Sequence, residues 1–160
     1  MKKLFAIIAI CFVTVTAVNA QDYNRAIGIE GGWGGVGLTY KQFTSSSTFL
    51  DFKATCWLLD GFGVLASGTY DFNQPLCPGL SFFYGLGVEA GIFTGMSHGV
   101  EYHGHLMAGA FGNIGLEYAF SAIPFAVSLD WNPGLRLVVG DSLKAGFAWE
   151  GLCLGIKYTF

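Results

Sequence analysis

The chain has 160 residues, of which 52% are apolar and only 12% are charged, and its net charge is −3. A mildly acidic chain lacks the basic surface that nucleic-acid binding requires, so nucleic acid is excluded as a partner. So many apolar residues with so few charges are unusual for a water-soluble domain and indicate a membrane protein.

The first twenty residues have the three-part order of a secretory signal peptide. Two lysines precede an apolar run that ends at Val13, and small residues close the segment at Ala20. The apolar run is shorter than the roughly 20 residues that a membrane-spanning helix needs. We therefore expect residues 1–20 to be cleaved and residues 21–160 to form the mature domain. Loss of the two lysines changes the net charge from −3 to −5.

The mature sequence alternates between apolar and small or polar residues, and this period of two predicts strands. Residues 25–43 hold either one strand or two, the two being 26–31 and 35–43 on either side of a Gly-rich turn around Trp33. The same alternation predicts six longer strands near residues 47–59, 61–73, 79–93, 105–120, 123–139 and 143–160. The short connection 121–124 indicates a periplasmic turn, and residues 94–105 indicate a long extracellular loop.

A chain of membrane-like composition without an apolar helix must close its strands into a barrel, because every backbone N–H and C=O group has to be paired. With one strand in residues 25–43 the total would be seven, but bacterial single-chain barrels have an even number of strands, so we expect two strands there and eight in all. We therefore predict an all-β fold, an eight-stranded antiparallel up-and-down transmembrane β-barrel with apolar side chains facing lipid. The alternative is a secreted soluble barrel with its apolar face inward. The non-apolar face of the strands argues against a soluble barrel, because this face is mostly Gly, Ser and Thr with scattered charges.

An eight-stranded barrel is just wide enough to be filled by its own side chains. Alternation places charges of both signs inside, where they must pair. The network expected in the lumen consists of Lys53, Glu89, Glu117, Asp130, Arg136 and Lys157, with Glu30, Lys41, Asp51 and Asp71 also inward. Such a network plugs the barrel. The alternative is a conduit for small solutes or a hydrophobic ligand, which inward Trp57, Leu65 and Phe83 oppose.

The stretches "GLEYAF", "PFAVSLDWNP" and the terminal "IKYTF" resemble a family of small outer-membrane β-barrel proteins of Gram-negative bacteria. The resemblance covers nearly all of residues 21–160. It implies a location in the cell outer membrane, with membrane lipids and the barrel-assembly machinery as partners. It also assigns Tyr158 and Phe160 to the assembly signal that the machinery reads in the last strand. Both rings suit the periplasmic aromatic girdle as well. We expect a monomer.

Candidate chemical groups gather in residues 94–105, namely Ser97, His98, Glu101, His103 and His105. Imidazoles and a carboxylate suit an enzyme that modifies lipid A, or a metal ion. However, no nucleophile is framed by turn residues, and the two histidines at 103 and 105 form a weak metal pattern. We therefore expect no enzyme activity, metal or cofactor, and a structural, surface or narrow-passage role. Cys56, Cys77 and Cys153 show no spacing typical of a disulfide framework or a zinc site.

Overall fold

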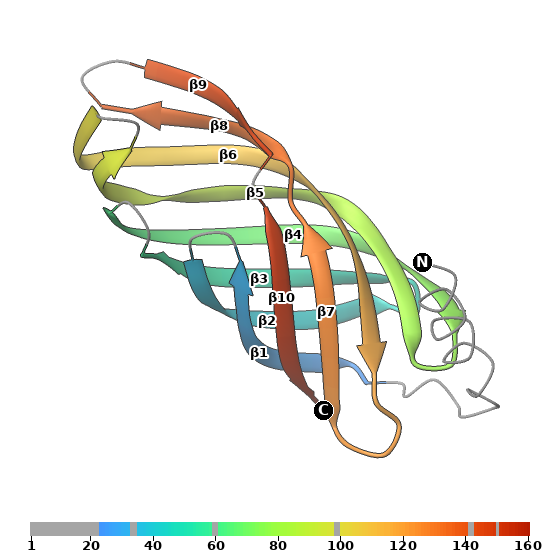
Figure 1. The fold of residues 1–160 in the computed structure, drawn as a ribbon. Coiled ribbons are helices and arrows are strands. Elements are labelled where there is room, and N and C mark those ends of the chain that lie inside the picture. The colour runs from blue at the N-terminus through green and yellow to red at the C-terminus, as the bar shows by residue number, and fades with distance from the viewer. Residues whose placement is uncertain (1–22, 33–34, 59–60, 98–99, 141–142, 150) are drawn as a thin grey trace, which may run out of the picture.

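The computed structural model describes residues 23–32, 35–58, 61–97, 100–140, 143–149 and 151–160. The expected signal peptide and the turn at Trp33 lie outside these residues. The strands, drawn in Figure 1, are β1 (Arg25–Gly32), β2 (Gly35–Ser45), β3 (Thr48–Trp57), β4 (Gly61–Cys77), β5 (Leu80–Ser97), β6 (Val100–Ala119), β7 (Phe125–Trp131), β8 (Gly134–Val139), β9 (Leu143–Ala148) and β10 (Leu152–Thr159). Among the described residues, no helix is long and apolar enough to cross a membrane.

The strands form one antiparallel sheet that closes on itself. Its order is β5-β4-β3-β2-β1-β10-β7-β6-β8-β9, and β5 also pairs with β6. β7 and β8 act as one strand along β6, interrupted at Pro133, which has no N–H to give to the ladder. β9 and β10 are likewise one strand with a break at 149–151. The result is the expected eight-stranded antiparallel up-and-down barrel, and the two strands expected within residues 25–43 are also confirmed.

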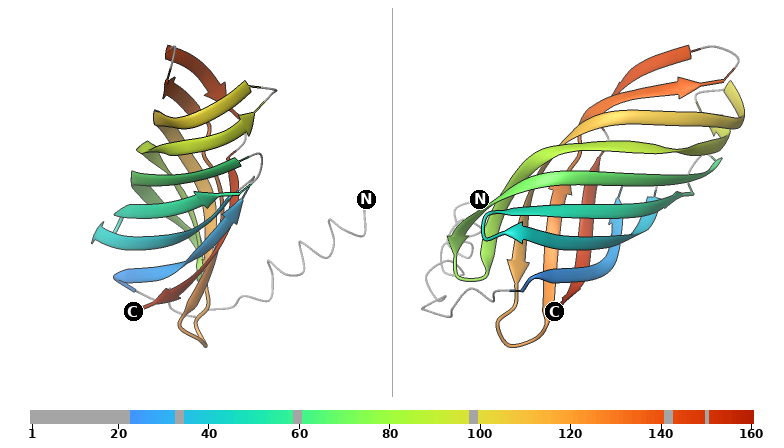
Figure 2. Two further views of the ribbon diagram at one scale, coloured as in Figure 1. Left: turned by 90° about the vertical axis from the view of Figure 1, so that its left-hand side faces the viewer. Right: turned by 180° about the vertical axis from the view of Figure 1, so that it is seen from behind.

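The first and last strands close the barrel at one end. The N–H of Arg25 donates to the C=O of Phe160 at 3.0 Å, and the N–H of Phe160 donates back to the C=O of Arg25 at 2.8 Å. Both described chain ends therefore lie together, as an even number of strands requires, and Figure 2 shows the strands leaving from there. We call this the terminus end, and the opposite end, where β1, β3, β5 and β8 end, the loop end.

The polarity of the barrel is the reverse of that of a water-soluble protein. Among the described residues, sixteen polar or charged side chains are buried but only eight apolar ones. Large apolar side chains cover the outside instead, with Leu86 76% exposed and Val88 65% exposed. At the terminus end the outer face carries contacting aromatic rings, such as Phe72 with Tyr84 and Phe125 with Tyr158. Alternation along each strand thus sends apolar side chains outward and polar ones into the lumen.

The prediction of a long extracellular loop over residues 94–105 is wrong for most of these residues, which belong to strands. β5 continues to Ser97, β6 begins at Val100, and these two residues face each other in the ladder. The register shifts just after Phe93, and Gly104 on the facing strand has a φ of +65°. A β-bulge of this kind absorbs the extra residue, so the hairpin continues through a Gly- and His-rich sequence that looks like a loop.

Candidate functional site

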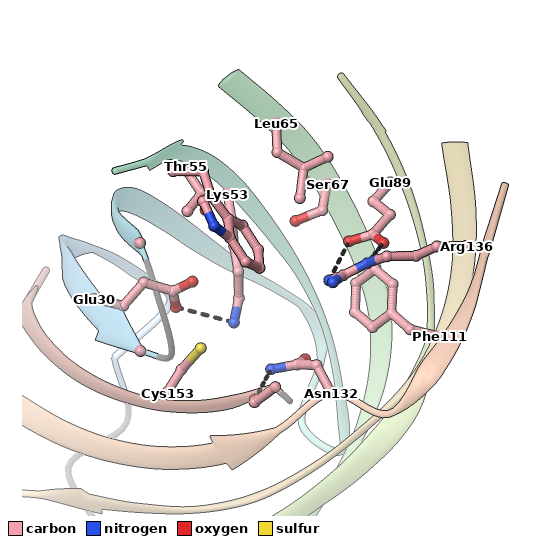
Figure 3. A pocket seen from close by; sticks show the side chains of 14 residues that line it. Glu30, Lys53, Thr55, Leu65, Ser67, Glu89, Phe111, Asn132, Arg136 and Cys153 are labelled. Atoms are coloured by element: carbon pink, nitrogen blue, oxygen red, sulfur yellow. Dashed lines mark hydrogen bonds and ion pairs between the residues drawn. The ribbon is translucent and has the colours of Figure 1, made fainter. Parts of the chain in front are cut away.

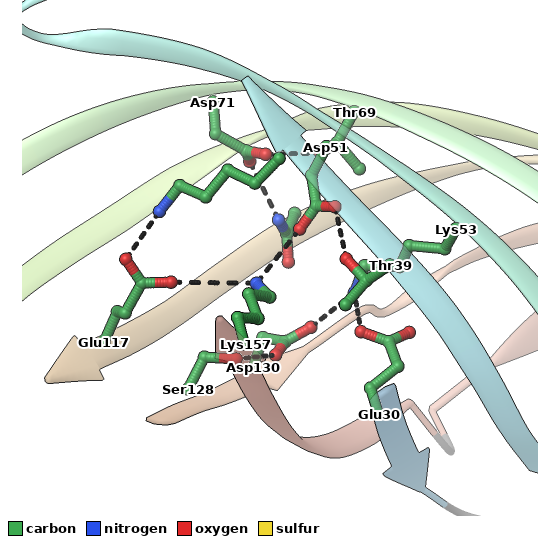
Figure 4. A network of polar contacts seen from close by, with 12 residues as sticks. Glu30, Thr39, Asp51, Lys53, Thr69, Asp71, Glu117, Ser128, Asp130 and Lys157 are labelled. Carbon is green, nitrogen blue, oxygen red and sulfur yellow. Dashed lines mark hydrogen bonds and ion pairs between the residues drawn. The ribbon is translucent and has the colours of Figure 1, made fainter. Parts of the chain in front are cut away.

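The lumen is the candidate site because charged side chains from six strands meet inside it. Their inward direction follows from the period of two along each strand, and the shear of the barrel brings distant segments to one level. We define the charged network as Glu30 (β1), Lys41 (β2), Asp51 and Lys53 (β3), Glu117 (β6), Asp130 (β7) and Lys157 (β10). Each of these side chains is at most 7% exposed. Figure 4 shows their contacts in two neighbouring groups, one around Glu117 and one around Lys53.

One half of the charged network is centred on Glu117. The Lys41 ammonium lies 2.7 Å from one oxygen of this carboxylate, and the Lys157 ammonium lies 3.7 Å from the other. Lys157 also lies 3.2 Å from Asp51, which links the second carboxylate to the first. Two cations therefore compensate two carboxylates inside the barrel, where each charge would be very costly alone.

The other half is centred on Lys53. Its ammonium lies 2.7 Å from Asp130 and 2.9 Å from Glu30, so one cation holds two carboxylates together. The Asn132 side-chain amide donates to the same oxygen of Asp130 at 3.3 Å. Neutral donors thus supply part of the compensation that the single lysine cannot give to both acids.

Neutral side chains complete the layer. Thr39 donates to Asp51 at 2.5 Å, and Asn113 donates to Asp71 at 2.9 Å. Thr69 is a further donor to Asp71. Asp71 is fully buried and receives these two hydrogen bonds, but no ion pair involves it among the described residues. The ion pairs and hydrogen bonds together cross-link this level of the lumen.

An aromatic layer lies directly on the charged network towards the terminus end. The ammonium of Lys41 sits 3.8 Å from the centre of the Phe49 ring, a cation–π contact. Phe49 in turn packs edge-on against Phe83 at 5.6 Å between ring centres. The Phe83 ring occupies the space beside Gly115, where a Cβ atom would lie only 2.4 Å from it. Glycine on one strand therefore makes room for a large ring from another, and the lumen is filled.

Tyr23 was not among the expected site residues, because it precedes the first strand and belongs to no alternating pattern. Its hydroxyl donates a hydrogen bond to Glu117, and its ring packs edge-on against Phe43 at 5.3 Å. Burial raises the pKa of the Tyr23 phenol well above its usual value, and the nearby Glu117 carboxylate raises it further. The phenol therefore stays protonated and remains a donor. Tyr23 thus covers Glu117 from the terminus end.

A small cavity opens above the charged network towards the loop end. Its volume is about 70 Å³, enough for a few water molecules, and its lining includes Glu30, Lys53, Trp57, Arg136 and Cys153. Figure 3 shows Arg136 and Glu89 reaching into it from one side and Lys53 and Glu30 from the other. The Arg136 guanidinium binds both oxygens of Glu89, at 2.5 and 3.3 Å. This end of the lumen is polar and closed at its base by the charged network.

A wider cavity of about 530 Å³ lies at the terminus end, on the other side of the charged network. Tyr23, Phe43, Asn73, Cys77 and Glu117 are among the residues that line it. The loop-end cavity and this one share no lining residue. These two cavities are therefore separate, with the buried side chains of the charged network between them.

The structure places the residues expected in the lumen in two groups. Lys53, Glu117, Asp130 and Lys157 come together in the charged network, while Glu89 and Arg136 form a separate pair nearer the loop end. Tyr158 and Phe160 lie on the outside at the terminus end, 46% and 54% exposed, with their rings stacked at 6.2 Å.

The candidate loop residues are not brought together by any described contact. His98 lies outside the described residues, and Glu101 and His103 belong to a part of β6 described by its backbone alone. His105 is half-buried opposite Phe93 and lies over Gly140. Cys56, Cys77 and Cys153 are all free thiols. Among the described residues, no group of three or more His, Cys, Asp or Glu side chains is arranged to hold a metal ion.

A closed eight-stranded barrel with an apolar outer band, an aromatic belt and a polar, ion-paired interior has the architecture of a transmembrane β-barrel. The fold is similar to the crystal structure of the N-terminal β-barrel domain of Pseudomonas aeruginosa OprF, with a TM-score of 0.59 and 16% sequence identity. The match covers 85% of this chain and 95% of that domain. The expected resemblance to outer-membrane barrels is thereby confirmed for the fold. No protein-family model and no curated protein matches the chain.

Proposed function

We propose that residues 21–160 form an integral β-barrel of the bacterial outer membrane, with a structural or surface role and a lumen that is closed to solutes. The exposed apolar outer band, the aromatic belt at the terminus end and the similarity to the OprF barrel domain support the location. The signal-like segment before residue 21 supports export. The barrel sits among outer-membrane lipids and reaches them through the barrel-assembly machinery.

The charged network carries the proposal of a closed lumen. It lies between two cavities that share no lining residue, and Lys41 and Asp71 in this level are 0% exposed. A solute would have to break several buried ion pairs at once in order to pass, which is costly in a low-dielectric interior.

Conductance in planar lipid bilayers tests the closed lumen. The purified protein should show no steady, large open state at any holding potential. The matched variant replaces Lys53, Glu30 and Asp130 together by serine, which removes the loop-end half of the charged network and should raise the frequency of small openings. A stable, porin-sized current from the unmodified protein would instead establish the channel alternative.

We propose that the protein is not an enzyme. The alternative, an enzyme that modifies lipid A, predicts that the modification is lost when the histidines near the end of the β5–β6 hairpin are replaced. Replacing His98, His103 and His105 together by alanine should leave the folded protein and the acylation pattern of lipid A unchanged. Mass spectrometry of lipid A from cells with and without the protein measures the pattern. A change in acyl chains that depends on the protein and disappears in the triple variant would show that the protein is an enzyme.

A further inference from the structure

The cavity at the terminus end is large enough to hold a small molecule, and a closed lumen has no use for it. Its volume of about 530 Å³ lies within the range of about 300–1,000 Å³ that is usual for ligand pockets. The cavity at the loop end, at about 70 Å³, has room only for a few water molecules. The terminus-end cavity is therefore the part of the lumen where a ligand fits.

The wall of this cavity is polar but almost uncharged. It is formed by the segment before β1, the β2–β3 turn, and the ends of β4, β5 and β6 that lie beside them. Of the described residues in this wall, Glu117 is the only charged one, and six others carry an aliphatic hydroxyl or an amide, namely Asn24, Thr44, Ser45, Ser46, Asn73 and Ser81. Among these described residues an anionic ligand would meet a carboxylate and no Lys, Arg or His, so an anion is disfavoured.

A cationic ligand is not favoured either, because the charge of Glu117 is already compensated. The Lys41 ammonium lies 2.7 Å from one oxygen of this carboxylate, and the Lys157 ammonium lies 3.7 Å from the other. A further cation near Glu117 would be repelled by both ammonium groups. The charges around the cavity thus favour an uncharged ligand.

Two buried oxygens in the wall accept no hydrogen bond within the described part of the chain. They are Oδ1 of Asn73, a residue that is 9% exposed, and Oε2 of Glu117, a residue that is 2% exposed. A buried acceptor without a donor is unfavourable. A ligand that brings O–H groups into the cavity supplies the donors that this part of the wall lacks.

Two aromatic rings form an apolar side of the same wall. Tyr23 and Phe43 pack edge-on at 5.3 Å between ring centres, and both line the cavity. Sugar rings combine apolar C–H faces with hydroxyl groups that both donate and accept hydrogen bonds, so they suit a wall of rings, hydroxyls and amides. We propose that the terminus-end cavity binds an uncharged, hydroxyl-rich molecule of the size of a mono- or disaccharide. This inference goes beyond the proposed function and does not depend on the membrane location.

Saturation-transfer NMR measures the binding of such a ligand to the protein as purified from cells, in a detergent without a sugar head group. The probes are glucose and maltose, with glucuronate as the anionic and glucosamine as the cationic counterpart of glucose. Glucose and maltose should give saturable transfer signals. Glucuronate should give none, because the one charged side chain of the described wall is a carboxylate. Glucosamine, at a pH where its amino group is charged, should bind no more tightly than glucose.

Two substitutions test whether the ligand lies in the terminus-end cavity. Ser81 is opposite Glu117 in the ladder and faces the lumen with it, so Ser81→Trp places an indole in the cavity and should abolish the signals. Asn73→Leu keeps a similar side-chain volume but removes the amide. It should weaken binding about tenfold, as loss of one hydrogen bond does.

The matched controls are the next residues on the same strands. Phe82→Trp adds an indole beside Ser81, and Gln74→Leu removes an exposed amide beside Asn73. Neighbouring residues of a strand point to opposite faces, so these two substitutions alter the outer face of the barrel. Both controls should bind the probes like the unmodified protein. Heat-modifiability shows that each variant is folded.

Absence of signals from both glucose and maltose with the unmodified protein overturns the proposal. Equal signals from Ser81→Trp and Phe82→Trp also overturn it, since the probes would then bind elsewhere. If Ser81→Trp does not fold, Asn73→Leu and Gln74→Leu decide in the same way. If glucosamine or glucuronate binds more tightly than glucose, the ligand is charged and the uncharged class is wrong.

Discussion

At the scale of single residues, Glu117 joins three other side chains in the lumen. It accepts from Tyr23 and Lys41 and lies near Lys157, and its neighbours come from three other parts of the chain. Lys41 is 0% exposed, and its ion-pair partner is Glu117. A charge so placed cannot be hydrated if its partner is removed.

Replacing Glu117 by glutamine should therefore lower the free energy of unfolding by about 3–5 kcal/mol, as loss of one partner of a buried ion pair does. Adding Lys41→Met should recover part of this loss, because it removes the uncompensated charge. Urea unfolding in lipid vesicles measures both effects.

The matched control for Glu117 is Glu89→Gln. Arg136, its partner, has a side chain that is 20% exposed, so water can hydrate it after the ion pair is lost. The Glu89 variant should lose less stability than the Glu117 variant. If Glu89→Gln lost more stability than Glu117→Gln, the charged network would not be the part of the lumen that contributes most to stability.

At the scale of elements, the last strand combines two roles. β10 closes the barrel against β1 over seven residue pairs, from Ala26 opposite Thr159 to Gly32 opposite Cys153. Its outward side chains, Leu152, Leu154, Ile156 and Tyr158, belong to the apolar outer face, and Phe160 follows them. The strand that closes the wall thus also presents the aromatic residues expected to be read during assembly.

Phe160→Ala should reduce the amount of folded protein in the outer membrane while leaving the backbone bonds to Arg25 in place. The ring is 54% exposed and stacks only on the outer face, so its loss removes a girdle anchor and a recognition feature without opening the lumen. Heat-modifiable protein in outer-membrane fractions is the measurement. Phe62→Ala, another exposed outward ring, is the control, and equal levels of the two variants would argue against a special role for Phe160.

At the scale of the whole molecule, the reversed polarity decides where the chain can fold. Its outer surface holds most of its large apolar side chains, so burying them requires lipid or detergent rather than water. The charged side chains of its interior are paired with one another instead of being hydrated.

Residues 21–160, diluted from urea, should accordingly become β-rich and heat-modifiable in detergent micelles or lipid vesicles, and should aggregate in plain buffer. Circular dichroism and gel migration of unheated samples report the outcome. Refolding to a monodisperse β-protein in buffer alone would support the soluble-barrel alternative, in which the apolar face points inward.

The sequence by itself determined the strands, their faces and therefore the content of the lumen. Alternation is a local property with a period of two, so it can be read without knowing which strands are neighbours. It predicted that Lys53, Glu117 and Asp130 point inward, while the count of eight strands also needed the rule that bacterial barrels have an even number. It misassigned residues 94–105 because Gly- and His-rich residues resemble a loop, while the bulge at Gly104 depends on the facing strand.

Only the tertiary structure decided which side chains meet. Lys41 and Glu117 are 76 residues apart in sequence, and Lys157 and Asp51 are 106 apart. Their pairing depends on the stagger between strands, which no single strand encodes. The same reason hides the contact of Tyr23 with Glu117, since the two residues are far apart in the sequence. Local periodicity thus fixes what a strand presents on each face, and closure of the barrel fixes what each face contacts.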